Sequence, residues 1–590
     1  MNSLRRLLPY YTPYRSRVAA GLFLVVLASG LASGVPWLLR LAIDRMRAGA
    51  LGPGIWGVAG AMIALAVGAG AARYYMREWL NGVSRRIEFD LRNDLFGHLA
   101  RLDAGWYART RTGEIMARLT NDLNAVRMAA GPAPMYLVNT IFGGLFALVF
   151  MLRISPRLTM LAVLPMLVLP FIMVRVGRMI HERFEAVQEQ FGRLTTLAQE
   201  NLAGVRIVRA YRQERAEIGR FGEMNDEYVS RNMRLAYLYG AMQPSFGLIA
   251  GVGAVIVLGV GGTLALRGTI SVGEFVAFGF YLTMLTWPLI ALGWVINLFQ
   301  RGAASMARLE EILDARPEIA SPAEPDQLPP NEAGRSLEFR GVGFHYPGAA
   351  GDPPRWVLRD ISFTVPAGST LGIVGATGSG KSALMDLIPR LHDPQEGEIL
   401  LDGVPIRRLD VETLRREIGY VPQESVLFSE SLGANLNYGT VDATAGEWAA
   451  RVAQLDETIR EFPGGYETLL GERGINLSGG QKQRAALARA LARKPSVVLL
   501  DDALSAVDTH TEAEILRALR EALAARTALI ASHRISAIRD ATWIIVLDEG
   551  RIVEQGRHEE LLSLGGRYWA LLNRQQLVES IEDDGAAVPA

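Results

Sequence analysis

A glycine-rich segment ending in lysine and serine is the strongest chemical signal in the sequence. It reads Gly375-Ala-Thr377-Gly378-Ser379-Gly380-Lys381-Ser382, after the apolar run 371–374 and before a helical pattern starting at Ala383. In a strand–loop–helix unit of this kind, glycines let successive backbone N–H groups converge on phosphate oxygens. Lysine here reaches the β- and γ-phosphates, and the serine hydroxyl binds Mg²⁺. The segment predicts a nucleotide phosphate site.

A second apolar run, residues 496–500, ends in Asp501. A carboxylate at the C-terminal end of a buried strand faces the magnesium ion in phosphate-loop proteins. The two segments together predict a Mg²⁺–ATP site with Ser382 and Asp501 as metal ligands. GTP is disfavoured, because the sequence has no N/T-K-x-D motif for reading guanine.

Six long apolar runs precede this region. Each has about 19 or more mostly uncharged residues, which is enough for a helix to cross a bilayer. Buried core helices are the alternative, but they seldom stay uncharged for so long and so often. An amphipathic stretch, residues 1–17, comes first and suits an interfacial elbow helix that is retained rather than cleaved. The predicted spans are 18–39, 55–76, 130–152, 158–176, 240–266 and 273–299.

Two of the gaps between spans, 77–129 and 177–239, are long, polar and rich in arginine. Their helical pattern predicts that spans continue beyond the membrane. The short gaps hold few arginines, so the long gaps are predicted to lie in the cytoplasm. An even number of spans places both termini, and the soluble region that follows, on that same side. We therefore expect a multi-pass membrane protein.

Composition divides the chain at a proline-rich linker, residues 316–335. Residues 1–320 carry 34 arginines, no lysine and 22 acidic residues, a net charge of +12, and residues 321–590 have a net charge of −12. The predicted order is an elbow helix (1–17), a six-span helical membrane domain (18–315), the linker, an α/β ATPase domain (336–575) and a disordered tail (576–590). The absence of cysteine excludes disulfide frameworks, thiolate metal sites and cysteine nucleophiles.

The segment Leu477-Ser478-Gly479-Gly480-Gln481 makes the resemblance specific, because it is similar to the LSGGQ signature of ABC transporters. The resemblance covers nearly the whole chain and implies an exporter half-transporter of a bacterial cell (inner) membrane, with six membrane helices fused to one nucleotide-binding domain. Segments 105–122 and 200–211 are also similar to these exporters. The family carries two coupling helices there, expected near 104–110 and 210–213.

The resemblance also implies roles for residues outside the phosphate loop. Gln423 matches a glutamine that contacts Mg²⁺ and the attacking water, and His533 matches the switch histidine at the γ-phosphate. Tyr346 matches the adenine-stacking aromatic ring, and Asp508 matches the D-loop aspartate. In the family, Ser478, Gly479, Gly480 and Gln481 complete the ATP site of a second chain, so dimerisation is expected.

One position departs from the family pattern. Asp502 stands where a glutamate usually polarises the attacking water, and its side chain is one methylene shorter. Displacing the catalytic carboxylate by about 1 Å can cost about 10²-fold in rate. We therefore expect that the ATP site of this chain is degenerate, which means that it binds ATP but hydrolyses it poorly. The chain would form a heterodimer with a partner that supplies the glutamate and performs most of the hydrolysis. The alternative is a homodimeric lipid flippase or exporter in which Asp502 is competent.

The cargo is predicted from the near absence of charge within the spans. A hydrophobic or amphipathic drug, lipid or peptide fits this composition better than an ion. In the last span, Phe280, Met284, Trp287 and Trp294 fall near one face and predict either a cavity wall or a packing surface. An importer and an ATP-gated channel are disfavoured by the domain arrangement and the chain length. Six spans exclude a soluble ABC protein that acts on nucleic acid.

Overall fold

The computed structural model describes the chain except residues 1, 50–52, 332–333, 347–354, 441, 443, 472–473 and 587–590. The chain forms two compact units. The helical unit comprises residues 1–100 and 112–315, and the α/β unit comprises residues 101–111 and 316–590. A short stretch between two long helices thus belongs to the α/β unit, although it lies far from that unit in sequence.

The helical unit contains only helices and turns in its described residues. Five helical segments there are long and apolar enough to cross a membrane: 3–47, 54–99, 112–154, 214–266 and 272–313. The helices are α1 (Leu8–Tyr11), α2 (Arg15–Arg47), α3 (Pro53–Leu99), α5 (Thr112–Ala117), α6 (Leu123–Ala130), α7 (Pro132–Ile154), α8 (Pro156–Val163), α9 (Leu169–Ala203), α10 (Val205–Ala210), α11 (Glu214–Ile256), α12 (Gly262–Leu266) and α13 (Val272–Leu313).

The predicted fourth span, residues 158–176, is not one continuous helix. It is divided into α8, a 3₁₀ turn over Pro165–Val168 and the first residues of α9. Proline lacks a backbone N–H and clashes with the preceding helical turn, so Pro165 and Pro170 account for the interruption. The sequence therefore predicted the apolar segment correctly but missed its break.

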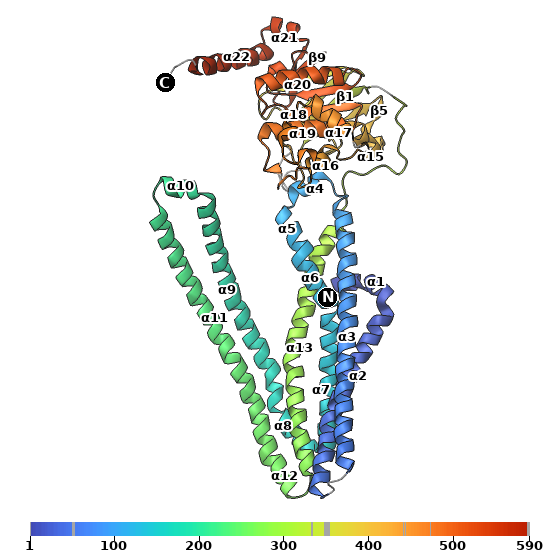
Figure 1. Cartoon of the computed structure of the whole chain (residues 1–590), viewed down its shortest axis with the longest axis vertical. Coiled ribbons are helices and arrows are strands. Elements are labelled where there is room, and N and C mark those ends of the chain that lie inside the picture. Colours follow the sequence, from blue (N-terminus) through green and yellow to red (C-terminus); the bar gives the residue numbers. More distant parts are fainter. Residues whose placement is uncertain are drawn as a thin grey trace. The chain divides into compact units, whose positions relative to one another are not determined.

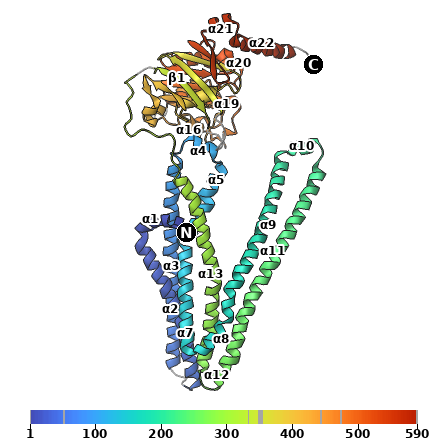
Figure 2. The same ribbon diagram turned by 180° about the vertical axis from the view of Figure 1, so that it is seen from behind.

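Helices α2, α3, α7 and α13 pack along one another, whereas α9 and α11 form a long hairpin that diverges from them toward α10 (Figures 1 and 2). Helices α7, α8 and α13 share a core that includes Met151, Leu158 and Phe278. Tyr281 is fully buried in this core, and its hydroxyl donates to the Ser33 carbonyl at 2.8 Å. The hairpin, in contrast, leaves large side chains such as Leu202 and Tyr237 exposed.

The predicted elbow consists of short helical turns, Asn2–Leu7, Leu8–Tyr11 and Thr12–Tyr14, that lead into α2. Two tyrosines tie it to α3: Tyr10 donates to Asp94 at 2.6 Å and Tyr14 donates to Asp90 at 3.2 Å. Arg6 pairs with Asp314 at the end of α13 at 2.7 Å. The elbow is therefore attached to two of the long helices.

The α/β unit is built on two sheets. Strands β2-β1-β4-β5 form an antiparallel sheet, and β10-β9-β3-β8-β7-β6 form a mixed sheet in which only β10 runs antiparallel to its neighbour. The strands are β1 (Leu337–His345), β2 (Trp356–Val365), β3 (Thr370–Gly375), β4 (Glu396–Leu401), β5 (Val404–Pro405), β6 (Ile418–Val421), β7 (Val497–Asp501), β8 (Thr527–Ala531), β9 (Trp543–Asp548) and β10 (Arg551–Gly556).

Helices cover the mixed sheet and enclose its apolar core. Strands β3, β7 and β8 are almost wholly buried, as expected for parallel strands with both faces covered. The helices of the α/β unit as a whole are α4 (Ala104–Arg109), α14 (Lys381–Leu387), α15 (Val411–Arg416), α16 (Leu432–Leu436), α17 (Ala445–Val452), α18 (Asp456–Glu461), α19 (Gly479–Ala492), α20 (Thr509–Ala522), α21 (His558–Leu564) and α22 (Arg567–Ala586).

The end of the chain differs from the prediction. Residues 576–586, expected to be disordered, continue the last helix, α22, and residues 587–590 lie outside the described residues. Tyr568 at the start of α22 is fully buried, and Leu571 and Leu572 pack against the same apolar cluster. The acidic composition of the tail concealed a helix that is anchored by apolar residues upstream.

Candidate nucleotide-binding site

The phosphate loop, residues 375–382, joins β3 to α14. Gly378 and Gly380 have φ angles of +83° and +104°, which side chains other than glycine rarely adopt. A Cβ atom on Gly375 would lie 2.2 Å from the Leu547 carbonyl oxygen. The hydroxyl of Ser379 is buried and has no hydrogen-bond partner among the described residues. The loop thus has the tight backbone and an unsatisfied polar atom that phosphate oxygens would complement.

Lys381, near the end of this loop, is hydrogen-bonded to the beginning of the loop. Its ammonium donates to the carbonyl oxygens of Gly375 at 2.9 Å and Ala376 at 3.1 Å, and the residue is only 6 % exposed. Burial lowers the pKa of Lys381, while Asp501 and Asp502 act in the opposite direction. The carbonyl oxygens occupy the acceptor positions that the oxygens of a β- or γ-phosphate would take.

Two oxygen-bearing side chains meet beside Lys381. The hydroxyl of Ser382 lies near the carboxylate of Asp501, which ends β7 and is 2 % exposed. Burial raises the pKa of Asp501, and neighbouring Asp386 and Asp502 add to the effect. A divalent cation would relieve this cost, and Mg²⁺ is commonly held by one or two protein oxygens together with phosphates. No cluster of three or more histidine or acidic residues that could bind a metal occurs in the described chain, so the phosphates would supply the remaining ligands.

Asp502 and His533 lie on adjacent strand ends, beyond β7 and β8. Asp502 has a φ angle of +48°, and its backbone N–H donates to the Ala531 carbonyl at 2.8 Å. Its carboxylate accepts a hydrogen bond of 3.4 Å from the backbone N–H of His533. Burial, followed by the charge of Lys381, lowers the pKa of the His533 imidazole. The structure therefore brings Lys381, Ser382, Asp501, Asp502 and His533 together.

Two predicted site residues lie more openly. Tyr346 follows β1 and is 44 % exposed, with its ring edge-on to Phe344 at 4.9 Å and to His392 at 5.4 Å between centroids. Gln423 is exposed in the loop after β6. An open aromatic ring can stack on a nucleotide base.

The signature segment, residues 477–481, forms the beginning of α19. Ser478 caps this helix by accepting from the Gln481 N–H at 3.3 Å, and the Gln481 side chain accepts from the Ser478 N–H at 2.9 Å. Gly480 packs against the D-loop, because an added Cβ atom would lie 2.8 Å from the Ala506 carbonyl oxygen. Ser478 and Gly479 are exposed. The start of a 14-residue helix is thereby presented to the surface.

Several polar residues that the sequence analysis did not identify connect the signature segment to the loop that carries His533. Gln483 in α19 donates to Ser505 at 2.9 Å and accepts from the Ala506 N–H at 2.9 Å. Arg534, next to His533, donates to the Ser505 carbonyl at 3.3 Å and to Glu512 at 2.6 Å. Asp508 does not join this set but caps α20 by accepting from the Thr511 N–H at 2.9 Å. The only sequence signal was the proximity of these residues to recognised motifs.

The first expected coupling helix is α4, which belongs to the α/β unit. Asp103 caps it by accepting from the Trp106 N–H at 3.0 Å, and it also accepts from the Glu318 N–H at 2.7 Å. Arg109 pairs with Glu318 at 2.8 Å. The second expected helix, near 210–213, is a turn instead. The short helix there is α10, over Val205–Ala210, and Arg212 follows it with a φ angle of +54°.

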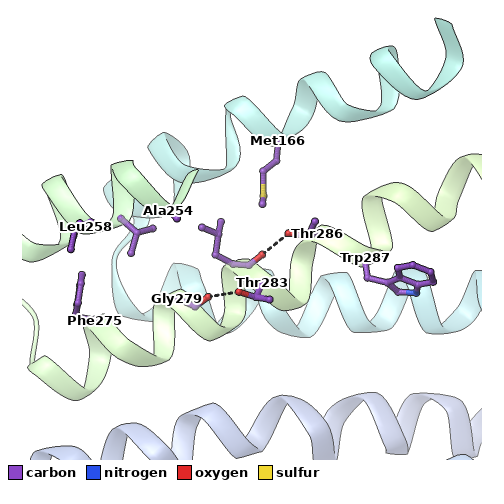
Figure 3. A pocket seen from close by; sticks show the side chains of 10 residues that line it. Met166, Ala254, Leu258, Phe275, Gly279, Thr283, Thr286 and Trp287 are labelled. Atoms are coloured by element: carbon purple, nitrogen blue, oxygen red, sulfur yellow. Dashed lines mark hydrogen bonds between the residues drawn. The ribbon is translucent and has the colours of Figure 1, made fainter. Parts of the chain in front are cut away.

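A cavity of about 540 Å³ lies within the helical unit between α13, α11 and the turn after α8 (Figure 3). Thr283 and Thr286 donate their hydroxyl hydrogens to the Gly279 and Leu282 carbonyls of their own helix. The sequence left open a cavity wall or a packing surface for Phe280, Met284, Trp287 and Trp294, and of these four only Trp287 lines this cavity. The lining residues are Met166, Ala254, Val257, Leu258, Phe275, Gly279, Leu282, Thr283, Thr286 and Trp287.

Comparisons with known proteins agree with this architecture. Residues 18–289 match the ABC transporter transmembrane region, and residues 358–505 match the ABC transporter family. The probable multidrug resistance ABC transporter ATP-binding/permease protein YheI of Bacillus subtilis (strain 168) is 39% identical over 587 residues, 99% of each chain. The ATP-dependent lipid A-core flippase of Syntrophus aciditrophicus (strain SB) is 34% identical over 97% of this chain and 94% of its own length.

A solved structure of a bacterial Atm1-family ABC exporter with ATP bound superposes with a TM-score of 0.76 at 29% identity, covering 95% of this chain and 98% of that one. These matches confirm the predicted fold class and the cofactors ATP and Mg²⁺. The chain belongs to the ABC transporters, as a membrane-embedded exporter with one helical membrane domain and one ATP-hydrolysing domain.

Proposed function

We propose that this chain is one half of an unequal pair of ABC exporter subunits and that its own ATP site turns over slowly. The partner is a second half-transporter with glutamate at the position of Asp502. The signature segment of this chain completes the ATP site of that partner, where most hydrolysis occurs. The pair exports hydrophobic or amphipathic molecules by alternating access.

The placement of Asp502 carries the proposal. Its carboxylate is short, its backbone has a positive φ angle, and one oxygen accepts the His533 N–H. A carboxylate engaged with the main chain is less free to orient a water molecule toward a phosphate. A general base must lie within about 3 Å of the group that it activates. The neighbouring residues Lys381, Ser382 and Asp501 remain in place to hold ATP and Mg²⁺.

The remaining site residues take their roles from the same geometry and the family pattern. Lys381 and the N–H groups of Gly375, Thr377, Gly378, Ser379 and Gly380 bind the phosphates. Ser382, Asp501 and Gln423 hold the metal, Tyr346 stacks on the base, and His533 contacts the γ-phosphate. Ser478, Gly479, Gly480 and Gln481 contribute an exposed, partly positive helix start for the partner's nucleotide. Asp508 shapes the D-loop between the two sites.

The cavity in the helical unit supports an uncharged or weakly polar cargo. None of its ten lining residues is ionisable. Both threonine hydroxyl hydrogens are used within α13, so the wall is mainly apolar with a few acceptor oxygens. A buried charge without a partner is costly, which disfavours a ligand that brings a charge into this space. The names of the relatives, a multidrug transporter and a lipid flippase, agree with such cargo.

The same proposal places the protein in a bacterial cell (inner) membrane, with both termini and the ATPase domain in the cytoplasm. The elbow and the long helical extensions expose arginines such as Arg5, Arg15 and Arg17. Arginine-rich segments on the cytoplasmic side are favoured by the positive-inside rule and by anionic headgroups.

Purification with and without the partner tests the pairing. We expect weak ATPase activity for this chain alone and strong activity for the co-expressed pair. Asp502→Ala should leave the activity of the pair nearly intact, whereas glutamate to glutamine in the partner should abolish it. Full activity of this chain alone, or loss of the pair's activity in Asp502→Ala, would instead support the homodimeric flippase.

Transport into proteoliposomes with a dye, a lipid and a peptide tests the cargo. Gly279 has open space where a side chain would begin, so Gly279→Leu should fill the cavity without a clash and reduce transport. Gly293 on the same helix also has open space but does not line the cavity, and Gly293→Leu is the matched control. Equal transport by both variants would show that cargo binds elsewhere.

A further inference from the structure

Gln575 in α22 bonds to both sides of the loop that carries His533. Its side-chain amide N–H donates to the His533 carbonyl, and its side-chain oxygen accepts from the Ile535 N–H at 3.0 Å. One carboxamide therefore satisfies a donor and an acceptor on the two peptide groups that flank Arg534. This pair of bonds fixes the backbone on the C-terminal side of His533.

The helix that presents Gln575 is itself firmly anchored. Tyr568, two turns earlier, is fully buried, and its hydroxyl is hydrogen-bonded to the His558 ring at 2.6 Å. Its backbone N–H donates to Glu554 at 3.0 Å. Leu571 and Leu572 pack with Ile535 and Ile538, which follow His533 in the chain. The same apolar cluster thus joins α22 to the loop that Gln575 contacts.

The opposite side of the loop faces the nucleotide site. The His533 N–H donates to Asp502, and the Arg534 guanidinium donates to Glu512 and the Ser505 carbonyl. With Gln575 on one side and these groups on the other, the backbone of His533 has little freedom. A hydrogen bond from an imidazole to a phosphate oxygen depends on the direction of the ring, which the backbone sets.

We propose that Gln575 is a positioning residue that holds His533 in the orientation needed to contact the γ-phosphate. This inference rests on the proposed role of His533 and makes the C-terminal helix part of the nucleotide sensor. Gln575 does not touch the nucleotide, so its effect should appear only for ligands that carry a γ-phosphate.

The test compares affinities for AMP-PNP and ADP, measured with Mg²⁺ on the full chain in lipid nanodiscs. Gln575→Met keeps the length of the side chain and removes both bonds. We expect it to weaken AMP-PNP binding about tenfold and to leave ADP binding unchanged. Gln575→Glu keeps the acceptor for Ile535 but turns an oxygen toward the His533 carbonyl, so it should weaken AMP-PNP binding as well. Gln576→Met, at the exposed neighbouring position, is the matched control.

A double-mutant cycle shows whether Gln575 acts through His533. His533→Ala should lower AMP-PNP affinity by a similar factor, and adding Gln575→Met should cause no further loss. Equal weakening of ADP and AMP-PNP, additive losses, or unchanged AMP-PNP binding in Gln575→Met would overturn the inference. If His533→Ala has no effect, the role of His533 fails and the inference fails with it. No turnover is measured, so the result does not depend on whether Asp502 supports hydrolysis.

Discussion

The ammonium group of Lys381 donates to the Gly375 carbonyl oxygen at 2.9 Å, across the loop that both residues delimit. The bond holds the lysine inside the phosphate loop, where burial makes an unpaired charge costly. Phosphate oxygens could accept from the same ammonium group in place of the carbonyl oxygens. The loop is therefore arranged for an anion in advance, at the cost of a lowered pKa for Lys381.

Removing this amine should strongly weaken nucleotide binding. For Lys381→Met we expect affinity for AMP-PNP to fall by about 100-fold, since charge-assisted hydrogen bonds each contribute about 1.5–3 kcal/mol. Displacement of a fluorescent nucleotide measures the effect. Lys494→Met is the control, because Lys494 is exposed and pairs with Asp442 at 3.4 Å, away from the phosphate loop in sequence. Comparable affinity in the two variants would show that phosphate is bound elsewhere.

Lengthening the carboxylate at position 502 should restore hydrolysis in this chain. Asp502→Glu adds the methylene that the family pattern contains, and we expect the ATPase rate of the chain alone to rise about 10- to 100-fold. Asp502→Asn keeps the length of the wild-type side chain and removes the charge, so it should give no gain. Steady-state phosphate release measures both. The proposal of a degenerate site is wrong if the glutamate variant is no faster than the wild type.

The Asp103 cap should affect transport more than hydrolysis. Asp103→Ala removes the bonds to Trp106 and Glu318, and loss of a helix cap costs about 1 kcal/mol. We expect cargo transport per ATP hydrolysed to fall about fivefold in proteoliposomes. Asp103→Asn can still accept one hydrogen bond and should be intermediate. A parallel loss of ATPase activity would point to general damage to the α/β unit instead.

The same cap predicts little pH dependence near neutrality. Burial raises the pKa of Asp103, but the N–H groups of Glu318 and Trp106 outweigh it and hold the pKa below its usual value. For a carboxylate with a lowered pKa, the stabilisation is present above the usual value and is lost as pH falls through the lowered one. Transport per ATP should therefore be constant from about pH 6 to 8 on account of this residue. A wild-type decline across that range that is absent in Asp103→Ala would contradict this.

The sequence predicted the parts of this protein that depend on local patterns. Phosphate binding by Lys381 and Ser382 needs a strand, a loop and a helix in direct succession, and the spacing of the residues specifies all three. Bonds between distant segments could not be predicted in this way. Gln575 lies 42 residues from His533, and Arg534 lies 22 residues from Glu512. Such contacts depend on how the helices pack, for which a single sequence carries no pattern.

The sequence analysis also failed to predict where a helix is interrupted. The apolar composition of residues 158–176 predicts a single span, because composition alone takes no account of Pro165 and Pro170. The structure has two helices and a turn there. The residues that line the cavity were also difficult to predict. Its wall on α13 contains Gly279 and Thr283, which helical spacing of large apolar residues could not select.

A buried ion cluster should make the stability of the α/β unit sensitive to acid. Arg335 is 5 % exposed and pairs with Asp402 at 2.7 Å and Glu417 at 2.9 Å. Arg335→Met leaves two largely buried carboxylates without their cation, which costs about 3–5 kcal/mol in comparable sites. We expect a clear decrease in the melting temperature by tryptophan fluorescence. Arg340→Met, which removes an exposed pair with Glu338 on β1, should change it little.

The pH dependence of the melting temperature shows whether Arg335 stabilises the α/β unit through its charge. Burial raises the pKa of Glu417, but hydrogen bonds from Arg335 and Ser496 outweigh it and lower the pKa below its usual 4.5. The stabilisation is therefore complete above that value and is lost as pH falls through the lowered pKa. The difference in melting temperature between the wild type and Arg335→Met should be constant from about pH 6 to 8 and shrink below about pH 4.5. A difference that persists unchanged under acid would mean that Arg335 stabilises the unit through packing of its side chain instead of its charge.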